Sequence, residues 1–155
     1  MKLQKASRFA LYAVLELAAD PARQLSAAEI AGRYGISTNH LAKVLRDLGR
    51  AGLVDSVRGV GGGYRFSGNA KRVTLYDVIE MFEDVSHRRA RERDPAEETD
   101  IGAALRVVLN EIDDIASATF RSITIDTLLK LMRRYRRLPA TTRDATHSSA
   151  PAADD

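Results

Sequence analysis

The sequence predicts a mainly α fold with one small β-hairpin. Apolar residues recur at helical spacing along most of the chain, residues typical of helix starts and stops bracket these segments, and one glycine-rich stretch lies between two short alternating runs. At 155 residues and 45% hydrophobic content, the chain can bury one core. We therefore expect one domain, or a small domain with an appendage.

Two helices are predicted before residue 36. The first carries a periodic apolar run over residues 9–18 and ends at an Asp-Pro pair. The second starts with a capping box, in which Ser26 and Glu29 have the required spacing, and Gly35 ends it. We expect Ile30 and Tyr34 to face the core.

A third helix follows at once. Ser37 is a candidate N-cap, Gly52 is the stop, and the buried stripe is predicted at Leu41, Val44, Leu45 and Leu48. Two helices joined by a tight turn that contains a glycine form a helix-turn-helix. The runs LVDSV and YRF then predict a β-hairpin whose tip is RGVGGG, residues 58–63.

The second half of the chain is expected to hold three more helical segments. The stretch VTLYDVIEMFEDV predicts a helix with a capping box at Thr74 and Asp77, and with Val78, Ile79 and Phe82 facing inward. A periodic segment from Ile101 to Ala116 predicts a helix of about 20 residues. TIDTLLKLMRRYRR predicts one or two further amphipathic turns.

These elements divide the chain into four parts. We expect residues 1–84 to form the domain with the hairpin, 85–100 a solvated linker, 101–138 the long helix and the terminal helix, and 139–155 a disordered tail. No window approaches about 18 consecutive apolar residues, and the start lacks the continuous apolar run of a signal peptide. We expect a cytoplasmic protein that makes no contact with membranes.

The charge is uneven and is positive around the hairpin. Residues 1–80 carry 12 Lys or Arg against 7 Asp or Glu, whereas residues 81–100 carry 4 against 7. Positions 37–72 hold seven basic residues and two acidic ones, so a polyanion is the expected partner.

Three interpretations compete for the glycine-rich stretch. A nucleotide-binding loop is disfavoured because neither glycine motif matches and because a strand, not a helix, follows. A plain hairpin turn would account for one or two of the glycines. A hairpin tip that approaches phosphates closely, with an arginine entering the minor groove, would account for all of them. Directly after a helix-turn-helix, such a hairpin is the wing of a winged helix.

The expected DNA-binding residues lie on the third helix, on the hairpin and at the start of the first helix. Asn39 can pair with adenine and Lys43 with guanine or phosphate, because the first turns of a recognition helix enter the major groove. The predicted set is Ser37, Thr38, Asn39, His40, Lys43, Arg46, Arg58, Gly59, Gly61, Gly62, Gly63, Tyr64, Arg65, Arg8 and Lys5.

Residues 29–66, EIAGRYGISTNHLAKVLRDLGRAGLVDSVRGVGGGYRF, resemble the central signature of the BadM/IscR/NsrR family of winged-helix transcription regulators. STNHLAKVL and RGVGGGYR are most similar to the NsrR, nitric-oxide-responsive repressor branch. The resemblance covers residues 1 to about 132. It implies a homodimer that binds palindromic operators and is joined through the long helix, at Leu105, Val108, Leu109, Ile112, Ile115 and Ala116.

One part of the family pattern is missing. Sensing members hold an iron–sulfur cluster through three cysteines before the long helix, whereas this chain contains no cysteine. Ala90, Ala96 and Gly102 stand roughly where those cysteines would fall, and Arg8 occupies the position of a carboxylate ligand in the nitric-oxide branch. We expect no metal and no cofactor. Either this is a natural cluster-free branch, controlled by a protein partner, a small molecule or nothing, or its cysteines were replaced.

The combined prediction is a transcriptional regulator, expected to be a repressor, that binds double-stranded DNA as a homodimer. The rival is a winged-helix module that binds a protein through its acidic linker or its basic RRYRR segment. An enzyme is not expected, because the sequence shows no nucleophile–base set, metal-ligand cluster or cofactor loop.

Overall fold

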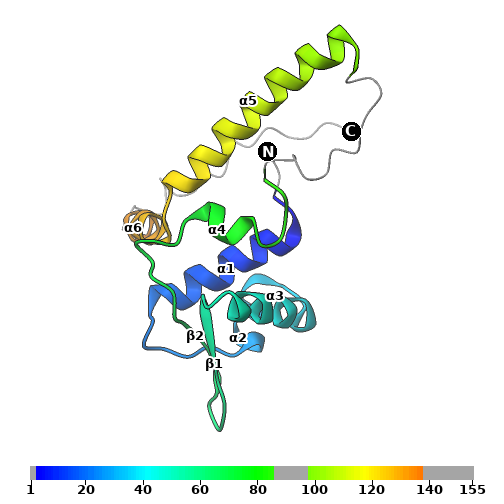
Figure 1. Cartoon of the computed structure of the whole chain (residues 1–155). Coiled ribbons are helices and arrows are strands. Elements are labelled where there is room, and N and C mark those ends of the chain that lie inside the picture. The colour runs from blue at the N-terminus through cyan, green and yellow to red at the C-terminus, as the bar shows by residue number, and fades with distance from the viewer. Residues whose placement is uncertain (1–2, 86–97, 138–155) are drawn as a thin grey trace, which may run out of the picture.

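The computed structural model describes residues 3–85 and 98–137 of the chain (Figure 1). The predicted tail at 139–155 and most of the predicted linker lie outside these ranges. In chain order the elements are α1 (Lys5–Ala19), α2 (Ala27–Tyr34), α3 (Thr38–Arg50), β1 (Val54–Val57), β2 (Gly63–Phe66), α4 (Leu75–Ile79), α5 (Asp100–Ser122) and α6 (Ile125–Arg136). This confirms the mainly α fold with one hairpin.

The main core forms where α1 crosses α2 and α3. Its centre holds side chains that are almost wholly buried, among them Val14, Leu17, Ile30, Leu41, Leu45 and Leu48. The hairpin adds Val54 and Phe66, and α6 adds Ile125 and Leu129 to the same core. Since each buried aliphatic side chain contributes about 1.5–3 kcal/mol, this shared core fixes the helix-turn-helix, the hairpin and α6 as one body.

The helix ends of the helix-turn-helix follow the predicted signals in part. Ser26 and Glu29 form the predicted capping box: the Ser26 amide donates to Glu29 Oε2 at 2.7 Å, and the Glu29 amide donates to Ser26 Oγ at 3.1 Å. Gly35 ends α2 with a left-handed φ of 61°. Ser37 occupies the N-cap position of α3, but its side chain accepts no capping hydrogen bond.

Tyr34 does not face the core, so that prediction is wrong. It lies at the surface, 36% exposed, where its ring stacks on the ring of Tyr12 with centroids 4.7 Å apart. Its hydroxyl donates to Glu16, an acceptor that the apolar core lacks. Partial burial and this hydrogen bond raise the pKa of the Tyr34 hydroxyl.

Two of the later helices differ in length from the prediction. The helix expected over VTLYDVIEMFEDV is only the five-residue α4, which the predicted box at Thr74 and Asp77 begins. Val78 and Ile79 are fully buried as expected, whereas Phe82 is half-buried. α6 spans 12 residues instead of one or two turns, because its apolar face packs on α1.

α5 projects from this body as a long arm (Figure 1). It has 23 residues, and only Ser117 among them is buried. Its last turns contact the body through Phe120, which packs against the second apolar cluster of Tyr76, Ile79 and Val85. No helix of the described residues is long and apolar enough to cross a membrane.

Candidate nucleic-acid interface

α3 presents a polar face opposite its buried stripe. The exposed residues on this face are Thr38, Asn39, His40, Lys43 and Arg46. The buried residues of the helix lie in the core. Because Ser37 does not cap the helix, its side chain leaves the amide groups of the first turn free to donate to a phosphate. The polar face therefore carries side-chain donors, and the N-terminal end of α3 presents backbone donors.

The hairpin is a regular two-stranded ladder. Val54 pairs with Phe66, Asp55 with Arg65, Ser56 with Tyr64, and Val57 with Gly63. The pair Asp55 and Arg65 is also joined by an ion pair of 3.3 Å. As Figure 1 shows, the hairpin extends away from α5 and beside α3, so its tip is far from the arm.

Hairpin geometry accounts for all four glycines of the predicted tip, not for one or two as expected. Gly59 and Gly61 have positive φ values of 112° and 76°. A Cβ on Gly62 would lie 2.4 Å from the Val57 carbonyl oxygen, and one on Gly63 would lie 2.6 Å from that of Leu25. Close approach to phosphates is therefore not needed to explain these residues, and the evidence for DNA contact rests on the charged side chains.

Three basic side chains of this surface have no acidic partner. Within the part of the chain that the structure describes, Lys43, Arg46 and Arg58 form no ion pair and no side-chain hydrogen bond, and all three are exposed. In contrast, Arg50 pairs with Asp47 at 3.4 Å. The three free cations are available to bind phosphates without first losing an existing partner.

A cleft of about 510 Å³ separates α3 from the hairpin. Arg46 and Arg50 line it from α3, and Asp55, Ser56 and Tyr64 line it from the strands. Tyr64 is half-buried and packs against the core, so its backbone and ring hold the hairpin in place. The walls of the cleft are α3 and the hairpin, and these two elements carry most of the predicted DNA-binding residues.

Lys5 and Arg8 are exposed but belong to a different part of the molecule. They lie at the start of α1, where the Gln4 amide donates to Glu83 Oε1 at 3.1 Å and Leu3 packs against the cluster around Ile79. The structure thus places these two residues beside the segment that follows α4. It does not bring them to the cleft.

Val60 is a candidate contact that sequence reasoning missed. It is fully exposed, at 111% of the reference value, at the hairpin tip between Gly59 and Gly61. Covering an exposed apolar side chain removes its surface from water, which is favourable in free energy. Apolar side chains also enter the minor groove in several DNA-binding proteins. The sequence signal was a single valine inside a glycine run.

The predicted dimerisation residues form an uncovered stripe on α5. Leu105, Val108, Leu109, Ile112 and Ile115 are 41–58% exposed, and Ala116 is half-buried. Spacings of three and four residues put them on one side of the helix. An apolar stripe of this length on a projecting helix is typical of a protein interface.

Comparison with known proteins agrees with this geometry. Residues 3–131 match the Rrf2 family, described as iron-dependent transcriptional regulators. The chain is 53% identical over 154 residues to a Rhodopseudomonas palustris protein named as an HTH-type transcriptional regulator, BadM, with 97% of each chain covered.

Two solved structures share the fold. CymR, the global cysteine regulator of B. subtilis, is 26% identical with a TM-score of 0.70, and the match covers 84% of this chain and 98% of CymR. IscR of T. potens is 24% identical with a TM-score of 0.67 over 92% of this chain and 96% of IscR. The finer likeness to the NsrR branch stays a prediction. Over nearly its whole described length, therefore, this chain belongs to the Rrf2 family of DNA-binding transcriptional regulators, which are not enzymes.

Proposed function

We propose that two copies of the chain bind one palindromic operator and repress transcription from it. The observation that carries this proposal is the surface formed by α3 and the hairpin, where Lys43, Arg46 and Arg58 are exposed and have no acidic partner among the described residues. The first turns of α3 would enter the major groove, and the hairpin tip with Arg58 and Val60 would reach the adjacent minor groove.

Dimerisation would place two such surfaces on one duplex. The exposed stripe on α5 supports it, since two stripes packed against each other would remove these apolar side chains from water. Family members typically are dimers. A two-fold dimer reads a palindrome, with half-site centres about one or two helical turns apart.

The residues present do not fit an iron–sulfur cluster, although the family is described as iron-dependent. The chain has no cysteine to supply a thiolate. The described residues contain no group of three or more His, Asp or Glu side chains that could replace such ligands. Arg8 is a cation and does not ligate a metal. We infer that this chain regulates transcription without a cluster, so a protein or a small molecule would supply any signal.

Footprinting of the purified full-length chain on fragments of its own genome tests the proposal. We expect protected sites that share an inverted repeat, and reduced transcription from the promoters that overlap them in a reconstituted assay. Protection without any inverted repeat would contradict the two-fold mode of binding. Increased transcription from the same promoters would contradict repression but not DNA binding.

A further inference from the structure

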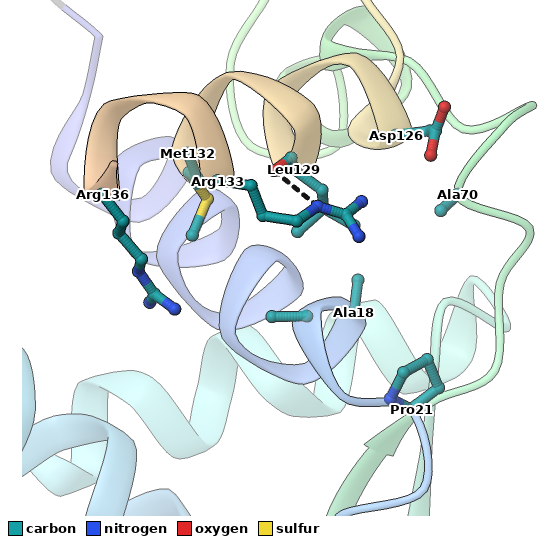
Figure 2. Close-up of a pocket in the computed structure, with 9 residues that line it drawn as sticks. Ala18, Pro21, Ala70, Asp126, Leu129, Met132, Arg133 and Arg136 are labelled. Atoms are coloured by element: carbon teal, nitrogen blue, oxygen red, sulfur yellow. Dashed lines mark hydrogen bonds between the residues drawn. The ribbon is translucent and has the colours of Figure 1, made fainter. Parts of the chain in front are cut away.

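A second hollow lies away from the candidate DNA surface. It is a pocket of about 410 Å³ between the end of α1, the loop before α4 and α6 (Figure 2). This volume is within the range of small-molecule sites in proteins. The pocket does not include any of the predicted DNA-binding or dimerisation residues, so the function proposed above does not account for it.

Most of the pocket wall is apolar. Ala18 and Pro21 line it from the end of α1, Ala70 from the loop, and Leu129 and Met132 from α6. Ala18 and Leu129 are already buried against the core, so they provide a firm base. A ligand with an apolar body would remove the remaining exposed carbon surface from water.

Two arginines add positive charge at one side. Figure 2 shows the Arg133 side chain lying across the opening, with its guanidinium directed between Ala18 and Asp126. Its Nε donates to the Leu129 carbonyl at 3.3 Å, which holds the side chain in place. Neither Arg133 nor Arg136 forms an ion pair with another described residue. The terminal nitrogens of Arg133 thus form no ion pair among the described residues, and the nearby Asp126 carboxylate acts on this guanidinium only through its charge.

Asp126 limits the charge that the pocket accepts. Its carboxylate lies on the far side from Arg136 and binds Lys130 Nζ at 2.8 Å. The hydrogen bond from Lys130 lowers the pKa of Asp126, so this group stays ionised at neutral pH. The lining therefore holds two arginines and one ionised aspartate, a net charge of +1, which a single carboxylate would neutralise.

We propose that this pocket binds a small monocarboxylate with an apolar body. The planar guanidinium of Arg133 matches a carboxylate through two parallel hydrogen bonds, and the aliphatic part of the ligand would lie along Leu129 and Met132. The site joins α6, which follows the α5 arm, to the end of α1, which leads into the helix-turn-helix.

Methyl NMR of the full-length chain with hexanoate and octanoate tests the site. The chain has three methionines, at positions 1, 81 and 132, and only Met132 lines the pocket. We expect the Met132 methyl signal, assigned with Met132→Leu, to shift in a saturable way while the Met81 signal stays in place. Hexanamide and octanamide, which have the same shape without the charge, should bind about tenfold more weakly.

Two matched variants separate the pocket from general surface binding. Arg133→Gln should weaken octanoate binding by about tenfold, whereas Arg134→Gln, which removes the same charge from the neighbouring position outside the pocket, should change it less than about twofold. Circular dichroism checks that both variants fold. An unmoved Met132 signal, equal binding of acid and amide, or equal loss in both variants would overturn the proposal. None of these measurements involves DNA, so their failure would leave the proposed function intact.

Discussion

Leu25 and Tyr64 form an isolated antiparallel bridge, with the Leu25 amide 3.0 Å from the Tyr64 carbonyl oxygen and the Tyr64 amide 2.8 Å from that of Leu25. The bridge ties the hairpin to the chain that enters α2, so the hairpin and the helix-turn-helix share one backbone frame. Gly63 lies directly against this bridge, because a Cβ there would meet the Leu25 carbonyl carbon and oxygen.

Gly63→Ala should therefore destabilise the protein by about 1–3 kcal/mol, since the added methyl group must push the two segments apart. Gly32→Ala is the matched control. Gly32 lies within α2, a Cβ there would meet nothing within 4 Å, and alanine should stabilise the helix by up to about 1 kcal/mol. Urea unfolding measures both. Equal stability of the two variants would show that the bridge does not constrain the hairpin.

Lys43→Ala and Arg58→Ala should each weaken operator binding by about 1–3 kcal/mol, because each removes a cation that binds DNA without losing another partner. Arg134→Ala, an exposed arginine on α6, should have little effect. Band-shift titrations on a footprinted site give the three affinities. If the α6 variant weakened binding as much as the other two, the assignment of the DNA surface would be wrong.

Binding should also weaken steeply with salt, because the exposed cations displace counterions from the duplex. A plot of log affinity against log salt should lose about one unit of slope in Lys43→Ala if that side chain binds a phosphate. Fluorescence anisotropy over a salt series measures the slope. An unchanged slope with reduced affinity would instead indicate that Lys43 contacts a base.

Ile112→Glu should separate the dimer, because it places a charge in the middle of the apolar stripe on α5. Val107→Glu introduces the same charge at a position that is 67% exposed and about 140° around the helix from Ile112. Sedimentation velocity should show monomers for the first variant and dimers for the second. If both variants were dimers, the dimer interface would have to lie on another surface of the protein.

The stability that the capping box of α2 provides should decrease in acid. The backbone and side-chain hydrogen bonds of Ser26 lower the pKa of Glu29 below its usual value of 4.5. The unfolded chain therefore binds this proton more readily, so the contribution is present above about pH 4.5 and is lost as the pH falls through the lowered pKa. Thermal melts of the wild type and Ser26→Ala from pH 3 to 7 should show a difference in melting temperature that becomes smaller in acid. A difference that does not change with pH would mean that the Glu29 carboxylate does not contribute to the stability of the capping box.

Periodicity and cap residues predicted the elements well, because both signals are local. The capping boxes at Ser26 and Thr74 are single-sequence features that the structure reproduces. The position of Tyr34 could not be predicted in this way, since it depends on Tyr12 and Glu16 from another helix. The length of α6 likewise depends on the α1 surface that covers its apolar side.

The candidate site likewise combines features that the local sequence determines with features that depend on tertiary contacts. Exposure of the α3 polar face follows from the stripe on its other side, so the sequence alone identifies it. The reason for Gly63 is a contact with Leu25, 38 positions away, and no local pattern indicates such a contact. The separation of Lys5 and Arg8 from the hairpin is also tertiary, because it depends on where α1 begins relative to the segment after α4.

The corner between α5 and α6 has a mechanical consequence. Two backbone hydrogen bonds join it to the loop before α4: the Leu75 amide donates to the Ile123 carbonyl at 2.8 Å, and the Ile125 amide donates to the Val73 carbonyl at 2.9 Å. These hydrogen bonds resist rotation of α5 relative to the rest of the protein. A dimer joined through α5 would therefore hold its two DNA-binding domains at a fixed separation, and the fold itself would set that separation.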